Sequence, residues 1–114
     1  MESLYEKMKE YVKMDTEISA AEFLDYYKQV MDKLVADFDQ LTEDELFQAK
    51  TITSIMSANA ATRGKRRDAN AKKFKKVNEK SKFWTDAIEY HLKKSGLSKE
   101  MIAERSAALE KEMQ

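Results

Sequence analysis

Proline is absent from this chain of 114 residues, and only two glycines occur, Gly64 and Gly96. Proteins built from sheets need many tight turns, in which glycine and proline are common, so this scarcity favours helices. The apolar residues also recur at helical spacing, which argues against disorder. A chain of this length is typical of one domain with a modest core. The sequence therefore predicts an all-α protein, with a single helical domain over residues 1–114.

Four segments begin with a residue that typically caps a helix. In three of them a serine or threonine is followed three residues later by glutamate, the pattern of a capping box. Apolar residues in helical phase follow each start, and they predict helices over residues 3–15 and 20–40, a third helix from residue 43, and a last helix after residue 98. The four capping residues are Ser3, Ser19, Thr42 and Ser98.

The chain between residues 43 and 95 allows two interpretations, which differ at Gly64. If the helix ends at this glycine in the left-handed conformation, the next helix folds back and the chain forms a compact, small bundle of four or five amphipathic helices. If the helix continues, it spans residues 43–95 and is roughly 80 Å long, with short helices packed on it. That arrangement would separate two small cores and would need an oligomer. The usual size of domains favours the compact bundle.

Charge is divided unevenly along the chain, although the 21 basic and 21 acidic residues balance. Residues 1–48 hold thirteen acids and five bases, whereas residues 63–94 hold twelve bases and four acids. The bases are densest in the polar segment 63–82, where ten lysines and arginines accompany only two acids, Asp68 and Glu79. In a helix several of these lysines lie four residues apart, where each like-charge pair costs about a few tenths of a kcal/mol. We therefore expect the segment to bind something negatively charged.

The residues that we expect to make this contact are arginines and lysines of the basic segment. A charge-divided helical module suits a protein partner or self-association, because complementary charges set orientation and association rate. The predicted function is that of an adaptor, assembly factor or regulator that docks on a larger partner through this segment. The expected contact residues are Arg63, Lys65, Arg66, Arg67, Lys72, Lys73 and Lys76.

The alternative partner is a nucleic acid. Lysines and arginines would neutralise phosphates and release counterions, and interleaved aromatic rings would stack on bases. Two features oppose this interpretation. Phe74 and Trp84 share the apolar seam of their helix, which predicts that they are buried, and the acidic half of the chain would repel a duplex. We therefore rank a nucleic acid below a protein partner.

The sequence offers no recognisable set of residues for catalysis, or for binding a metal ion, a cofactor or a small-molecule substrate. His91 is the only histidine and cysteine is absent, which excludes the usual paired zinc ligands and thiol chemistry. The acidic run from Glu43 to Glu45 lacks the alternating ligands and central glycine of a calcium loop, and it fits the first turn of a helix, where the dipole favours anions. We therefore expect a protein without enzymatic activity.

The chain also contains no apolar run long enough to cross a membrane. Its first residues, MESLYEKMKEY, are too charged for a secretory signal. These features predict a cytoplasmic protein.

Overall fold

The computed structural model describes residues 1–114 and contains helices but no strand, which confirms the predicted all-α class. Five α-helices and one short 3-10 helix form a bundle of 43 × 26 × 23 Å. The chain turns back after α3, so the compact bundle is confirmed and the continuous helix over residues 43–95 is wrong. In chain order the elements are α1 (Glu2–Val12), α2 (Ala20–Asp37), η1 (Phe38–Gln40), α3 (Glu43–Arg63), α4 (Ala71–Lys94) and α5 (Lys99–Glu112).

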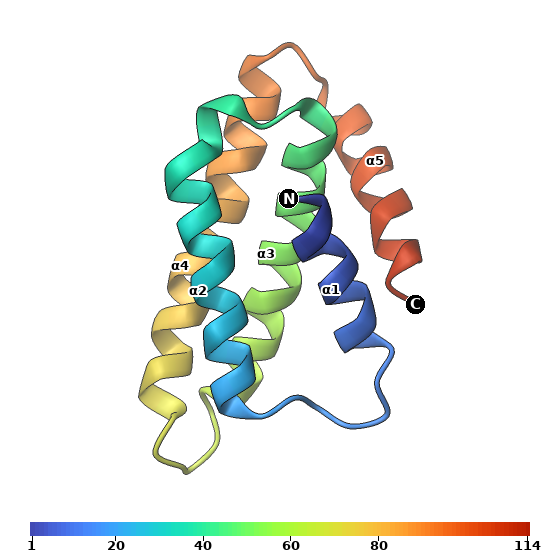
Figure 1. Cartoon of the computed structure of the whole chain (residues 1–114). Coiled ribbons are helices and arrows are strands. Elements are labelled where there is room, and N and C mark those ends of the chain that lie inside the picture. Colours follow the sequence, from blue (N-terminus) through green and yellow to red (C-terminus); the bar gives the residue numbers. More distant parts are fainter.

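Helix α3 lies at the centre of the bundle, with α2 and α4 on one side and α1 and α5 on the other (Figure 1). Its buried residues include the consecutive Thr51, Ile52 and Thr53, which point in different directions around the helix axis. A helix whose neighbours cover most of its faces has no single apolar stripe. The other four helices therefore pack around α3.

One core of nineteen buried apolar residues draws on all five α-helices. Aromatic contacts place α2 beside α4 within it: the rings of Phe23 and Phe74, near the starts of the two helices, are 5.2 Å apart, and those of Phe38 and Trp84 are 5.5 Å apart. The two helices therefore run in the same direction, with the acidic α2 next to the basic α4. None of the helices combines the length and the apolar character needed to cross a bilayer.

Three of the four predicted capping residues do cap helices. At α3 the box is complete, because Thr42 Oγ1 accepts a hydrogen bond of 3.2 Å from the Glu45 amide and the Glu45 carboxylate accepts one of 3.1 Å from the Thr42 amide. Ser19 forms half of its box, since its side chain accepts from the third amide of α2. Ser98 caps α5 in the same way. Local sequence therefore sets the starts of α2, α3 and α5.

The predicted box at Ser3 is wrong, because α1 already begins at Glu2 and has no side-chain cap. Met1 explains the shift. Its side chain is buried in the core, and its ammonium group lies 3.5 Å from the Glu45 carboxylate at the start of α3. A tertiary contact of the first residue thus starts the helix before the local capping signal, and the helix ends at Val12 rather than at residue 15.

Both glycines lie at helix ends, but only Gly96 is left-handed, with φ of 105°. Its amide donates to the Lys93 carbonyl and the Leu97 amide donates to the Leu92 carbonyl, which is the Schellman pattern that ends a helix at glycine. Gly64 has φ of −67°, so the left-handed conformation expected there is wrong. Gly64 is instead buried where the start of α4 passes the end of α3.

Candidate interaction surface

Arg63, the first of the predicted contact residues, lies inside the fold and is only 7% exposed. Its Nη2 donates a hydrogen bond of 2.7 Å to the Ile18 carbonyl. Its guanidinium also lies between two aromatic rings, 4.9 Å from the centre of Phe23 and 5.3 Å from that of Phe74. The planar cation stabilises the junction of α2, α3 and α4 by cation–π contact. Arg63 therefore faces the interior rather than solvent, and it is not available at the surface as a contact residue.

Arg66 binds a carboxylate of the same chain. Its Nη1 and Nη2 atoms donate hydrogen bonds of 2.6 and 2.9 Å to the two oxygens of Glu17, in the loop that joins α1 to α2. These hydrogen bonds hold the pKa of Glu17 below its ordinary value, and the same pair raises the pKa of Arg66. Arg66 thus fastens one loop of the bundle to another, although its side chain stays partly exposed.

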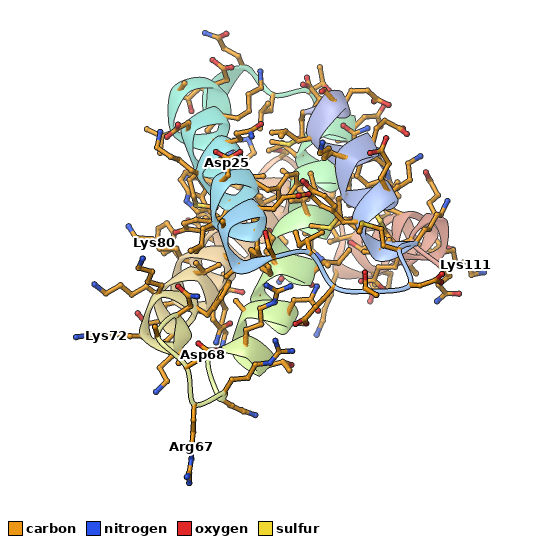
Figure 2. All side chains as sticks on the ribbon, turned by 60° about the horizontal axis from the view of Figure 1, so that its bottom comes forward. Asp25, Arg67, Asp68, Lys72, Lys80 and Lys111 are labelled. Carbon is orange, nitrogen blue, oxygen red and sulfur yellow. The ribbon has the colours of Figure 1, made fainter.

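The other eight cations of the basic segment form no ion pair, and all eight are exposed. Figure 2 shows Arg67 projecting away from the bundle at the turn between α3 and α4, and Lys72 and Lys80 projecting outward from α4. Six of the eight are concentrated within twelve positions, and we call them the cationic tip. The cationic tip consists of Lys65, Arg67, Lys72, Lys73, Lys75 and Lys76.

Local structure adds to the positive potential of the cationic tip. The first turn of α4 contains no acidic residue, and its capping residue Asn70 makes no side-chain hydrogen bond. The amides at this helix start give it a partial positive charge, which acidic residues usually offset. Asp68 is the only acid between Lys65 and Lys76, and its carboxylate accepts a hydrogen bond of 2.9 Å from the Asn70 amide. Lys72 and Lys73 therefore add charge where a helix normally disfavours it.

No carboxylate of the acidic half of the chain forms an ion pair with a residue of the cationic tip. Helix α2 lies beside α4, yet two of its four acids pair with lysines of α2 itself, at 3.4 Å for Lys28 and Asp32 and at 2.8 Å for Lys33 and Asp37. No ion pair joins α2 to α4. The lysines of the cationic tip are thus in direct contact with no carboxylate of α2.

Arg105 of α5, which the sequence reasoning missed, binds acids at the start of α3. Its guanidinium forms ion pairs with Glu43 and Asp44 and lies 4.1 Å from the ring centre of Phe47. It is the only arginine of the last helix, and that was the one signal available in the sequence. The acidic run at Glu43–Glu45 thus holds α5 and the first residue of the chain in place.

The sequence reasoning also missed two exposed aromatic residues of α4. Phe83 is 62% exposed and Tyr90 is 66% exposed. They lie seven residues apart, on the side of α4 opposite its buried stripe. Phe74 is buried as predicted, and Trp84 is half-buried against the core. Helical phase alone would have separated the exposed rings from the buried ones.

The single histidine, His91, is exposed and lies 5.4 Å from the ring of Phe38. No three His, Asp or Glu side chains are grouped closely enough to hold a metal ion. No protein-family model matches the chain, and neither does any curated protein or solved structure.

Proposed function

We propose that this protein is a non-enzymatic interaction module that docks on a larger, negatively charged protein partner through the cationic tip. In this proposal it acts as an adaptor, assembly factor or regulator in the cytoplasm. The contact residues are those of the sequence-based expectation that face solvent without a partner, Lys65, Arg67, Lys72, Lys73 and Lys76, together with Lys75. Arg63 and Arg66 support the fold beneath them.

The supporting observation is the contrast between paired and unpaired cations. Arg63, Arg66 and Arg105 each meet a carboxylate, whereas none of the six cations of the tip does. Like charges at Lys72 and Lys76, four residues apart on one helix, repel each other and weaken the helix. An acidic surface brought against the tip would remove this repulsion. It would also fix the orientation of the complex and accelerate association at low salt.

The experiment compares two variants with the same change of net charge. In the tip variant Arg67, Lys72, Lys73 and Lys76 are replaced by glutamate. In the control variant glutamate replaces four exposed lysines elsewhere that form no ion pair, namely Lys7, Lys13, Lys99 and Lys111. Each tagged protein is incubated with an extract of the cells that express the chain, and bound proteins are identified by mass spectrometry. We expect one partner set with the wild type and the control, and its loss with the tip variant.

Equal capture by the tip variant and the wild type would contradict the proposal. Loss of capture with both variants would contradict it too, because it would show that net charge rather than the tip drives binding. Raising the salt concentration should weaken capture by the wild type, since exposed charges are screened over about 8 Å at physiological ionic strength.

A nucleic acid is the second candidate partner, and the exposed ring of Phe83 favours it. Phe83 lies on α4 close to Lys80 and Lys82, two further cations without an ion pair. An exposed ring beside unpaired lysines is the combination that binds single strands, where stacking contributes about 1–3 kcal/mol per base. Under this second function Phe83→Ser would weaken binding of a single-stranded oligonucleotide, and nuclease treatment of the extract would abolish capture. Capture of the same proteins after nuclease treatment would exclude it.

A further inference from the structure

A cavity of about 280 Å³ lies between the α1–α2 loop and the carboxyl-terminal half of α3, and no residue of α4 lines it. Its apolar floor is formed by the buried side chains of Met8, Phe23, Tyr26 and Met56. The volume is close to the lower end of the range for ligand pockets, roughly 300–1,000 Å³. A small molecule with a short alkyl chain is therefore of a size that this cavity could take.

One wall of this cavity is formed by Arg63 and Arg66, which share a single carboxylate. Glu17 accepts two hydrogen bonds from Arg66, but its carboxylate is 3.7 Å from Arg63 Nη2. The buried guanidinium of Arg63 forms one hydrogen bond, with Ile18. Asp15 also lines the cavity and forms no ion pair with either arginine. A buried cation is normally paired and fully hydrogen-bonded, so this wall has the capacity to bind one more anion.

We infer that the cavity binds a small amphipathic acid, whose apolar body lies on the floor and whose carboxylate binds Arg66 and Arg63. The Glu17 carboxylate occupies the position on Arg66 that the ligand carboxylate would take, and it moves aside when the ligand enters. Glu17 belongs to a loop, so this movement leaves the helices intact. Neither arginine belongs to the cationic tip, and the inference therefore does not rest on the proposed docking function.

Three probes with the same alkyl chain and different head groups test the inference: octanoate, octan-1-ol and octylamine, each below its micelle-forming concentration. The amide signals of the ¹⁵N-labelled wild-type protein are followed by NMR during each titration. Octanoate should shift signals of residues 8–18 and 56–63 and leave those of α5 and of the cationic tip in place. A hydrogen bond between charged groups discriminates strongly, so octanoate should bind about tenfold or more tighter than octan-1-ol, and octylamine should bind weakest.

The variant Glu17→Gln provides a second test, because the inference predicts that it increases the affinity for octanoate. The variant removes the carboxylate that competes for Arg66, and an exposed ion pair contributes up to about 1 kcal/mol, so octanoate should bind about two- to fivefold tighter. Binding of octan-1-ol should not change. Glu104→Gln, at an exposed position of α5 without an ion pair, is the matched control and should leave both affinities unchanged. Val12→Trp should fill the cavity and abolish octanoate binding.

Three outcomes would overturn the inference. Equal affinities for octanoate and octan-1-ol would show an apolar cavity without preference for an acid. Signals that move at the cationic tip rather than at the cavity would show octanoate acting as a surface counterion. No shift with any probe would show that the cavity takes no such ligand. The titration of the wild-type protein distinguishes these three outcomes even if Val12→Trp fails to fold. None of the three outcomes affects the proposed docking function, which is tested by partner capture.

Discussion

Gly64 lies so close to Lys75 that a β-carbon at position 64 would be 3.1 Å from Lys75 Cγ and 3.4 Å from the Lys75 amide nitrogen. The same β-carbon would be 3.2 Å from the Ala60 carbonyl oxygen. The backbone of α4 thus crosses the end of α3 at the one position without a side chain. This close approach accounts for glycine at a residue that has an ordinary φ and stands directly after the last residue of α3.

Substitution of Gly64 should therefore destabilise the fold through overpacking. For Gly64→Val we expect the free energy of unfolding to fall by about 1–3 kcal/mol, with a smaller effect for Gly64→Ala, because only the larger side chain forces α3 and α4 apart. Urea denaturation followed by circular dichroism measures both. A Gly64→Val variant as stable as the wild type would show that the close approach is not required.

Substitution of Arg63 and of Arg67 should have very different effects on stability, although the two residues are only four positions apart. Arg63→Ala removes a buried cation bound to the Ile18 carbonyl and to two rings, and should lower the free energy of unfolding by about 2–4 kcal/mol. Arg67→Ala removes an exposed side chain without an ion pair and should change it by less than about 0.5 kcal/mol. Equal effects of the two substitutions in a denaturation experiment would contradict this division between fold and surface.

Reversing one charge of the cationic tip should stabilise the isolated protein. Lys72→Glu places an acid in the first turn of α4 and replaces the repulsion from Lys76 with attraction, which should raise the free energy of unfolding by about 0.5–1.5 kcal/mol. Lys80→Glu, in the middle of α4, gains the attraction to Lys76 without the contribution of the helix dipole and should raise it less. Thermal denaturation at low salt compares the three proteins. A loss of stability with Lys72→Glu would mean that this lysine supports the fold.

Acid should destabilise the fold through two glutamates. The hydrogen bonds from Arg66 lower the pKa of Glu17, and the hydrogen bond from the Thr42 amide lowers that of Glu45, both from an ordinary value of 4.5. Because the folded protein binds these protons less readily than the unfolded chain, the stabilisation is complete well above pH 4.5 and is lost as the pH falls through the lowered values. Urea denaturation between pH 7 and 3 should therefore show a shallower decline for Glu45→Gln than for Glu104→Gln. Parallel declines would contradict this assignment.

The starts of three helices could be predicted because their capping groups are local. Thr42 and Glu45 satisfy each other's amides within one turn, so no distant residue is needed. The start of α1 could not be predicted in this way, because it depends on the burial of Met1 against α3. The end of α3 was ambiguous for the same reason: the contact between Gly64 and Lys75 exists only once α4 has folded back.

The candidate surface was predicted as a stretch of sequence but not residue by residue. Charge counts treat Arg63, Arg66 and Arg67 alike, whereas the fold buries the first, pairs the second and exposes the third. The difference follows from where α3 ends and from the path of the loop that contains Glu17 and Ile18. Both are tertiary properties. The exposed rings of Phe83 and Tyr90, in contrast, follow from helical phase and were within reach of the sequence.

The most direct test of the docking surface is the chemical reactivity of individual lysines. The purified protein and the protein in an extract of its own cells are treated briefly with an amine-acetylating reagent, and the modification of each lysine is measured by mass spectrometry. We predict that Lys72, Lys73 and Lys76 are protected in the extract, while Lys7, Lys99 and Lys111 react equally in both samples. Equal reactivity of the three tip lysines with and without extract would contradict the account, because it would show that nothing binds to this surface.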